Sequence, residues 1–215
     1  VENEITEIII NTHHLNNLVE SYIGNSTWKN IVTIVYEPSL LGTGGTILQN
    51  QVFFQKDDFL VAHADNMFNF TLEELFKSHK NRDQKSIATM LTFYTDEPYN
   101  CGVVSVDENS IIQKFDEKNP LLSERSLANA AIYIFSNKIY DYFKSDPGDF
   151  TDLSLDIIPK MIGSINCCIH AGEIIDIGTM AAWNNANLHT DSKISEFLEP
   201  NQKAWNAVLK NISST

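Results

Sequence analysis

The sequence lacks any apolar run that approaches the roughly 20 residues needed to cross a bilayer. It does not open like a secretory signal peptide either, because "VENEITEIII" (1–10) carries acidic residues where such a peptide has basic ones. Cysteines number only three, and two of them, Cys167 and Cys168, are adjacent, which is an awkward arrangement for a disulfide. We therefore expect a cytoplasmic protein with no membrane partner.

Cations are also scarce. Lys and Arg total 15 against 28 Asp and Glu, which gives a formal charge of −13 and no basic footprint for a nucleic-acid backbone. We expect no nucleic-acid partner. If this chain handles phosphates, the few cations near the site, or a bound metal, must neutralise them.

Apolar runs alternate with helical patterns along the first half of the chain. This alternation predicts an α/β fold with a Rossmann-like mixed, mostly parallel sheet and helices on both faces. Thr71 and Glu74 have the spacing of a capping box that opens a helix through His79. Strands are predicted at 4–11, 31–36, 58–64, 86–94, 128–136 and 173–179, a β-hairpin at 101–118, and helices at 14–23, 47–54 and 153–162. We expect one domain over 1–190 and a helical tail over 191–215, which could pack on a second copy as easily as on its own domain.

A glycine-rich turn, "LLGTGGT" (40–46), follows the predicted strand at 31–36. Bare glycines allow main-chain N–H groups to approach a flat or anionic ligand. The turn is neither a Walker loop nor a dinucleotide fingerprint. A tight left-handed turn into a helix explains the glycines equally well, so both interpretations stay open.

Two aspartates lie at predicted strand ends. Asp65 follows the strand at 58–64, and Asp176 lies between two isoleucines just before Gly178. Ligands of α/β sheets bind at the carboxyl ends of strands, and Mg²⁺ prefers one or two carboxylates with phosphate oxygens and water. Asp65 alone is also explained as a turn former, whereas a carboxylate among isoleucines needs a partner or a metal. The pair is a candidate Mg²⁺ site.

The end of the predicted hairpin reads "QKFDEKN" (113–119). Strand alternation places Lys114, Asp116 and Lys118 on one face and Phe115 and Glu117 on the other. A solvated strand end is the default interpretation. In a chain with so few cations, Lys118 is nevertheless a candidate for binding a phosphate.

The order of these motifs resembles the sugar-phosphate nucleotidyltransferase family, also called nucleoside-diphosphate-sugar pyrophosphorylases. Six segments carry the resemblance across roughly residues 4–190, in the family's order. They are "EPSLLGTGGTI", "HADN", "NCGVVSVDENSIIQKFDEKN", "NAAIYIF", "DIIPKMI" and "IIDIGTMAAWNNAN". The spelling is nearer to guanylyltransferases of mannose or heptose phosphate than to thymidylyltransferases, but the base and the sugar stay open.

The resemblance implies the nucleotide-diphospho-sugar transferase fold and a reaction. A sugar 1-phosphate attacks the α-phosphorus of a nucleoside triphosphate, pyrophosphate leaves, and Mg²⁺ neutralises the developing charge. By resemblance, Asp65 and Asp176 hold the metal, and Lys118 binds the sugar phosphate as a catalytic residue. The nucleotide base would lie against Leu41, Gly42, Thr43, Gly44 and Gly45, and the hairpin region would bind the sugar through Gly102, Glu117, Lys118 and Asn129.

The sequence also departs from the family pattern. Ala131 replaces the glycine of an N-x-G segment, and Cys101, Asn119 and Met180 replace a tyrosine and two prolines. The family's G-x-G-T-R-L-x-P segment is not found, so we expect roughly 45 to 50 residues of a parent protein to precede Val1. These departures keep a second hypothesis open, a non-catalytic relative that senses a nucleotide or sugar phosphate. A glycosyltransferase is disfavoured, because "HADNMF" offers no D-x-D pair.

Overall fold

The structure is a computed structural model that describes residues 5–54, 56–68, 71–145, 151–171 and 174–189. The chain divides into two compact units, one comprising Val1–Leu41 with His189–Thr215 and the other comprising Gly42–Leu188. The predicted helical tail at 191–215 lies outside the described residues. Among the helices that the structure describes, none has the length and apolar character to cross a membrane.

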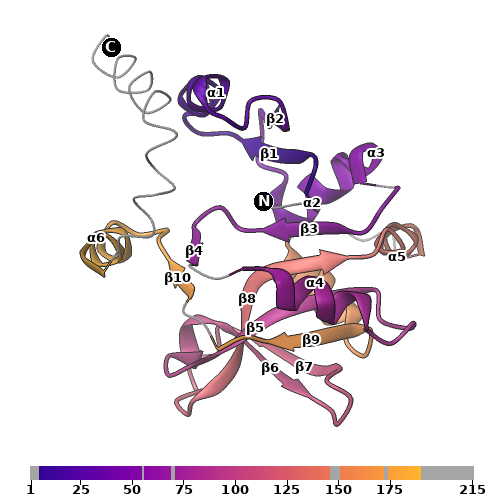
Figure 1. Cartoon of the computed structure of the whole chain (residues 1–215). Helices are drawn as coiled ribbons and strands as arrows, with labels where there is room; N and C mark the ends of the chain where they lie inside the picture. Colours follow the sequence, from indigo (N-terminus) through magenta and orange to yellow (C-terminus); the bar gives the residue numbers. More distant parts are fainter. Residues whose placement is uncertain (1–4, 55, 69–70, 146–150, 172–173, 190–215) are drawn as a thin grey trace. The chain divides into compact units, whose positions relative to one another are not determined.

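The described part of the first unit is a βαβ unit. Strands β1 (Ile8–Thr12) and β2 (Val32–Tyr36) pair in parallel, from Ile8 opposite Val32 to Thr12 opposite Tyr36. Helix α1 (Asn16–Asn25) forms the crossover that a parallel pair requires (Figure 1). The parallel arrangement predicted for this part of the chain is confirmed here.

The second unit is built on a six-stranded sheet. Its strands run in the order β7-β6-β8-β5-β9, and β3 pairs with β8 off this path. Only β5 and β9 run parallel, and every other described pair in this sheet is antiparallel. The strands are β3 (Phe59–Ala62), β5 (Ala88–Thr95), β6 (Gly102–Val106), β7 (Ile112–Glu117), β8 (Ser126–Phe135) and β9 (Ile165–Ile169).

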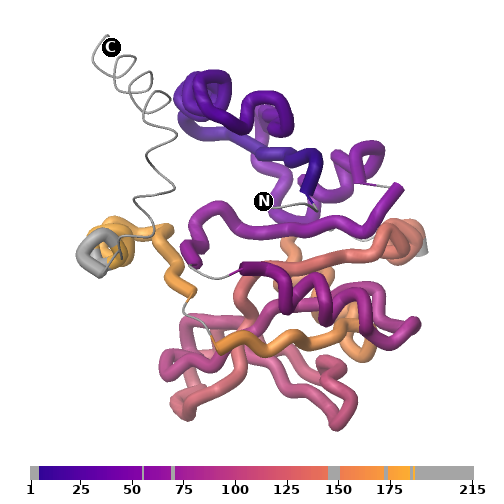
Figure 2. The backbone as a smooth tube through the Cα atoms, in the orientation of Figure 1, coloured from indigo at the N-terminus to yellow at the C-terminus, as the bar shows by residue number. Residues whose placement is uncertain are grey.

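The prediction of a mostly parallel sheet is therefore wrong for this unit, although the α/β class is confirmed. Strands buried on both faces have the same continuous apolar sequence whichever direction their neighbours run, and β8 is such a strand. The predicted hairpin is confirmed as β6 and β7, which Figure 2 shows as adjacent segments of the chain.

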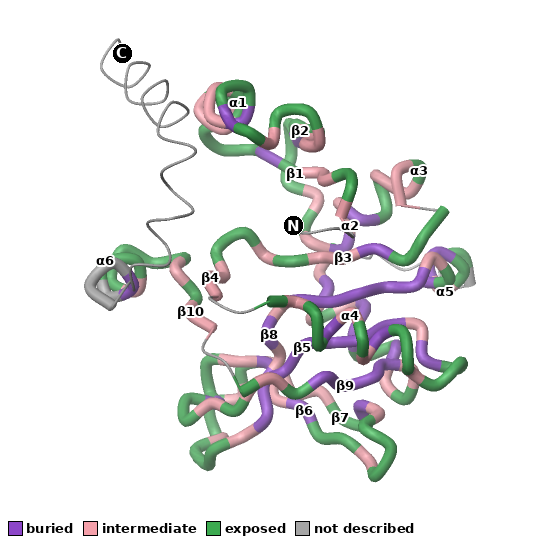
Figure 3. The backbone as a smooth tube through the Cα atoms, viewed as in Figure 1, coloured by how far each residue is buried: buried purple, intermediate pink, exposed green. Residues whose placement is uncertain are grey.

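Helices cover both faces of this sheet, as predicted. Along β8, Tyr133 and Phe135 join one core cluster while Ile132 and Ile134 join another, because successive side chains of a strand point to opposite faces. Figure 3 shows that most of β8 is buried. Helices α2 (Gly42–Gln49) and α5 (Ile139–Ser145) and the 3₁₀ helix η3 (Ile158–Met161) supply the first cluster, and α4 (Glu73–Lys80) supplies the second through Leu75.

Several short elements connect these layers. Helix α4 begins after Leu72 without a side-chain cap, so the predicted Thr71 capping box is wrong although its helix is confirmed. The predicted helix at 153–162 is instead a π-helical turn, η2 (Leu153–Ile157), followed by η3. The others are α3 (Gln51–Phe54), η1 (Pro98–Asn100), the paired strands β4 (Asn66–Phe68) and β10 (Ile174–Asp176), and α6 (Met180–His189).

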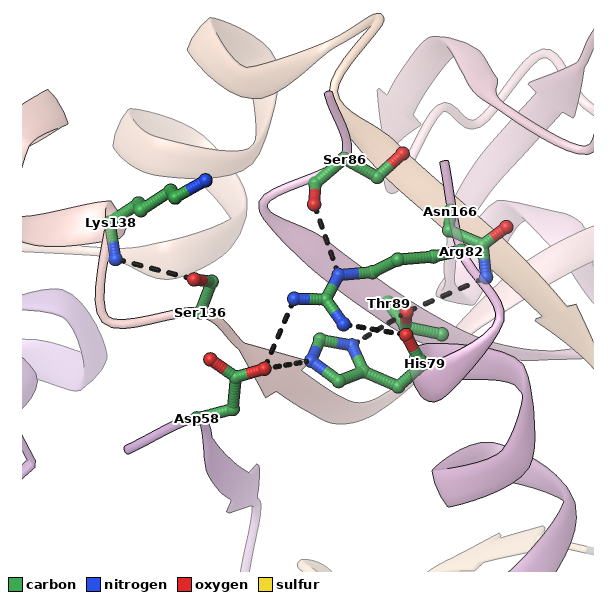
Figure 4. Close-up of polar contacts among 8 residues, drawn as sticks. All are labelled: Asp58, His79, Arg82, Ser86, Thr89, Ser136, Lys138 and Asn166. Carbon is green, nitrogen blue, oxygen red and sulfur yellow. Dashed lines mark hydrogen bonds and ion pairs between the residues drawn. The ribbon is translucent and has the colours of Figure 1, made fainter. Parts of the chain in front are cut away.

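A polar network fixes the end of α4 against β3 and β5 (Figure 4). The buried ring of His79 lies with Nε2 2.9 Å from Asp58 Oδ2 and Nδ1 2.8 Å from Thr89 Oγ1. Arg82 donates to the same Asp58 oxygen at 3.0 Å and to the carbonyl oxygens of His79 and Ser86. A neutral ring that donates from Nε2 and accepts at Nδ1 satisfies both contacts.

Burial lowers the pKa of His79, the Asp58 hydrogen bond opposes this, and the positive charge of Arg82 lowers it further. Burial raises the pKa of Asp58, but the hydrogen bond from His79 and the charge of Arg82 outweigh burial, so its pKa lies below the usual value. The network thus holds an ionised carboxylate beside a neutral imidazole.

Candidate functional site

Asp65 and Asp176 come together beside Gly178. A Cβ atom built on Gly178 would lie 3.0 Å from Oδ1 of Asp176 and 3.1 Å from Oδ2 of Asp65. Both side chains are exposed. The two carboxylates therefore approach one point that only the missing side chain of a glycine leaves open.

The strands β4 and β10 produce this convergence. They pair antiparallel with Asp176 opposite Asn66, and the N–H of Ile177 donates to the carbonyl oxygen of Asp65 at 2.8 Å. The N–H of Gly178 donates to Asp176 Oδ1 at 2.7 Å, which orients that carboxylate. The sequence placed both aspartates at the carboxyl edge of a parallel sheet. Asp176 instead ends β10 and Asp65 directly precedes β4, the two strands of a separate antiparallel pair, yet the two carboxylates do meet.

The chemistry of this pair suits a hard divalent cation. Mg²⁺ is bound through one or two carboxylates, with water and substrate phosphate oxygens completing its octahedron. Among the residues that the structure describes, no group of three or more His, Cys, Asp or Glu side chains could hold a metal. Two carboxylates fit a cation that also needs oxygen atoms from a substrate.

A β-bulge in β8 contacts the segment that carries Asp65. The pairing of β5 with β8 shifts register between Met90 and Thr92, and within the bulge Ala131 has a φ of 53°. Asn66, next to Asp65, donates from Nδ2 to the carbonyl oxygen of Ala130 at 2.8 Å. The bulge thus anchors the chain that carries Asp65.

The same bulge holds Asn129. Its Oδ1 accepts the N–H of Ala131 at 2.9 Å, and its Nδ2 donates to the hydroxyl of Tyr133 at 2.6 Å. Tyr133 is completely buried, and burial raises the pKa of its hydroxyl. The Asn129 amide, predicted to lie near a sugar, is engaged on both ends in shaping β8.

Gly102 and Glu117 face each other across the hairpin. They are register partners, and a Cβ on Gly102 would lie 2.5 Å from Glu117 Oε2 and 2.6 Å from Phe115 Cζ. The carboxylate and the aromatic ring thus occupy the space that a side chain at position 102 would take. The hairpin therefore brings these two predicted sugar-site residues together. Lys118 follows directly, with a φ of 46° and its N–H donating to the carbonyl oxygen of Cys101 at 3.0 Å.

The carboxylate of Glu117 has an unusual environment. Burial raises its pKa, the charge of Lys118 lowers it, and the charge of Asp152 raises it again. It receives no hydrogen bond from any residue in the described part of the chain. A half-buried carboxylate without a donor is a common feature of binding sites, since a ligand can supply the donor.

The glycine turn packs against a distant segment. Gly42 has a φ of 76°, and a Cβ there would lie 2.2 Å from the carbonyl oxygen of Thr151. The N–H of Gly44 donates to that oxygen at 2.9 Å, and Thr43 Oγ1 accepts the N–H of Leu153 at 2.8 Å. The tight-turn explanation is thus sufficient for Gly42, which begins helix α2 directly.

Gly45 is half-buried in the same helix, whereas Leu41, the first residue of the predicted nucleotide loop, belongs to the other unit. Sequence reasoning missed the segment from Thr151 to Asp156, which contacts the turn. Its signal was Asp152, which directly precedes the predicted helix at 153–162, because aspartate is a preferred N-cap residue.

The chain is similar to known proteins in both sequence and fold. Residues 1–193 match the Nucleotidyl transferase family, and the chain belongs to that family. It is 27% identical over 174 residues to the glucose-1-phosphate adenylyltransferase of Clostridium beijerinckii, a match that covers 76% of this chain and 45% of that protein. It is 32% identical over 174 residues to the UTP--glucose-1-phosphate uridylyltransferase of Synechocystis sp., covering 74% of this chain and 44% of that protein.

The chain thus spans less than half the length of these two curated relatives. Among solved structures, HddC from Yersinia pseudotuberculosis complexed with GMP-PN matches with a TM-score of 0.69 at 22% identity, covering 84% of this chain and 77% of that one. That likeness establishes the nucleotidyltransferase fold. The relatives named here by their curated descriptions are sugar-1-phosphate nucleotidyltransferases.

Proposed function

We propose that this chain forms most of a sugar-1-phosphate nucleotidyltransferase that makes a nucleotide sugar and pyrophosphate from a nucleoside triphosphate. An oxygen of the sugar 1-phosphate forms a bond to the α-phosphorus while the bond from that phosphorus to the bridging oxygen breaks. Pyrophosphate carries away the electron pair of the broken bond. The convergence of Asp65 and Asp176 beside Gly178 is the observation that carries this proposal.

In this proposal each group of residues has its own task. A bound Mg²⁺ would neutralise charge that develops on the phosphates. Asp65 and Asp176, which the β4–β10 pair brings together, would hold that ion. Glu117 and Gly102, which are register partners, would receive the sugar, and Lys118, the next residue along the chain, would bind its phosphate. Asn129 shapes the wall behind the sugar, since its own side chain is occupied by Tyr133 and Ala131.

The nucleotide base is proposed to lie against the turn from Leu41 to Gly45. The contact with Thr151 accounts for Gly42, so the support for the base site rests on the remaining positions and on family membership. Gly45, which is half-buried, has no side chain to obstruct a planar ring.

The test measures pyrophosphate release by the full-length protein, including whatever its reading frame encodes ahead of Val1. A panel of nucleoside triphosphates and sugar 1-phosphates is supplied with Mg²⁺. We expect turnover with at least one pair, and a loss of at least about 100-fold in Asp65→Asn and Asp176→Asn. Asp141→Asn, which alters an exposed carboxylate on α5, is the matched control and should retain activity.

Two results would count against the enzyme. One is pyrophosphate release that survives both substitutions, because the reaction would then not depend on the carboxylate pair. The other is tight binding of a nucleotide, measured by calorimetry, with no turnover of any pair. That second result would favour a non-catalytic sensor of the same fold.

A further inference from the structure

The turn that follows β7 carries Lys118, the residue proposed to bind the sugar phosphate. Lys118 has a φ of 46°, a left-handed conformation that few lysines adopt, and its N–H donates to the carbonyl oxygen of Cys101 at 3.0 Å. Such a backbone persists only where neighbouring contacts hold it, and strained residues of this kind cluster at binding sites. The contacts that hold this turn therefore bear on the proposed phosphate site.

Asn119 makes those contacts through both ends of its side-chain amide. Its Nδ2 donates to Asp116 Oδ2 at 2.9 Å, and its Oδ1 accepts the N–H of Leu121 at 3.0 Å. Its main-chain carbonyl oxygen accepts the N–H of Leu122 at 3.2 Å, which closes a β-turn. An asparagine side chain that accepts the N–H two residues further on favours such a turn. Asn119 thus connects a residue before Lys118 with residues after it.

Asp116 is an acidic residue that would otherwise compete for the ammonium of Lys118. An uninterrupted strand would place these two side chains on one face, two residues apart. The left-handed turn ends that alternation, and Asp116 Oδ2 instead accepts from Asn119 and lies 3.6 Å from Nζ of Lys114. In the part of the chain that the structure describes, the exposed ammonium of Lys118 forms no ion pair.

A lysine without an ion pair is valuable to a phosphate site in this chain. Lys and Arg total only 15 against 28 Asp and Glu, so most cations have acidic competitors. A carboxylate bound to Lys118 would have to be displaced before a phosphate could bind, and that displacement would weaken binding. An ammonium that is already available avoids this cost.

We propose that Asn119 is a positioning residue for the sugar phosphate. It holds Lys118 in the left-handed turn and keeps Asp116 from pairing with it, so that the ammonium is available to the phosphate of a sugar 1-phosphate. This inference rests on the proposed function. Asn119 acts through Lys118 and not by contact with the substrate.

Asn119→Ala in the full-length protein tests this role, because alanine removes both side-chain hydrogen bonds. The preferred sugar 1-phosphate is first identified from the panel, and its KM and that of the triphosphate are measured. We expect the sugar 1-phosphate KM to rise about fivefold, as the net loss of one hydrogen bond predicts, and the triphosphate KM to change less than about twofold. Lys118→Met should raise the sugar 1-phosphate KM about 10- to 100-fold, since hydrogen bonds to charged groups are stronger.

A double variant shows whether Asn119 acts through Lys118. If it does, Lys118→Met combined with Asn119→Ala should raise the sugar 1-phosphate KM no further than Lys118→Met alone. Independent roles would multiply, so a further increase of about fivefold in the double variant would overturn the inference. An unchanged KM in Asn119→Ala, or equal increases for both substrates, would overturn it as well.

Asp116→Asn tests the competing carboxylate. It removes the negative charge but keeps an oxygen that can accept from Asn119. Added to Asn119→Ala, it should recover part of the lost affinity for the sugar 1-phosphate, because position 116 then carries no charge that could pair with Lys118. A double variant that recovers nothing would contradict the inference.

Asn109→Ala is the matched control. Asn109 lies exposed in the turn at the other end of the same hairpin, and its side chain forms no hydrogen bond with the residues that the structure describes, so neither KM should change. Thermal melting establishes that each variant is folded. If Asn119→Ala does not fold, Asn119→Asp decides by the same comparison, because it keeps the acceptor for the Leu121 N–H and loses the donor to Asp116.

Calorimetric titration with the same sugar 1-phosphates separates this inference from the proposed function. If wild type binds a sugar 1-phosphate without turnover of any pair, the proposed enzyme fails. Weaker binding by Asn119→Ala, which disappears in the Lys118→Met background, then still supports the positioning role. If wild type is active but Lys118→Met leaves the sugar 1-phosphate KM unchanged, the enzyme stands and the inference is overturned. No binding to wild type also overturns it.

Discussion

Replacing Ala131 by glycine tests the bulge that holds Asn129 and anchors the Asp65 segment. Ala131 has a φ of 53°, a left-handed conformation that costs a non-glycine residue about 1–2 kcal/mol. Glycine removes that cost but adds about 0.5–1 kcal/mol of conformational entropy loss on folding. It also gives up a partly buried methyl group, about 0.4 kcal/mol if half of its transfer free energy is realised. Ala131→Gly should therefore range from a small loss to a gain of about 1 kcal/mol.

The neighbouring Ala130 is the matched control. It is 2% exposed and has no positive φ, so Ala130→Gly relieves nothing and loses about 1.5 kcal/mol from chain entropy and methyl burial. The free energies of unfolding, from urea titrations followed by circular dichroism, should differ by about 1–2 kcal/mol in favour of Ala131→Gly. For a chain of this length that corresponds to roughly 2–8 °C in Tm. Equal losses at the two positions would refute the strain argument.

Three further predictions concern single residues. Gly42→Ala should lower the free energy of unfolding in urea by at least about 2 kcal/mol, because its methyl group would lie 2.2 Å from the Thr151 carbonyl oxygen and Gly42 has a φ of 76°. A variant as stable as wild type would contradict this prediction. In the folded chain, burial keeps the pKa of His79 below its usual value of 6.5. The free energy of unfolding should therefore be highest above pH 6.5 and should decrease as the pH falls toward the folded pKa. His79→Gln should lack this pH dependence when urea midpoints are compared between about pH 5 and 8. Gly178→Ala should weaken Mn²⁺ binding about tenfold, measured by calorimetry, because the added methyl group would crowd both proposed metal carboxylates. The Tm should change little. An unchanged Mn²⁺ affinity would argue against a metal at that point.

The meeting of Asp65 and Asp176 could be predicted because each follows a short apolar run. A carboxylate at the end of such a run is explained by a partner or a metal, and one metal site explains both. The hairpin of β6 and β7 was equally accessible, since Asp107 to Asn109 interrupt two alternating strands. Both features depend on the amino-acid sequence of a short segment. Such local patterns can be recognised without knowing how the rest of the chain folds.

Strand direction could not be predicted in the same way. An antiparallel and a parallel strand that are both buried on two faces have the same apolar composition, so β8 carried no signal of its partners' directions. The role of Gly42 was also hidden, because the oxygen that occupies its side-chain space belongs to Thr151, more than a hundred residues away.

The position of β8 has a consequence for how the second unit is assembled. Phe59 of β3 pairs with Phe135, so the earliest strand of the sheet has no partner there until the ribosome has delivered most of the unit. Contacts between residues so distant in sequence slow folding, because the entropy of closing a long loop is lost before the contacts can stabilise the chain. Until then β3 and β5 present unpaired strand edges, and co-translational chaperones have an extended target between the synthesis of Phe59 and that of Phe135.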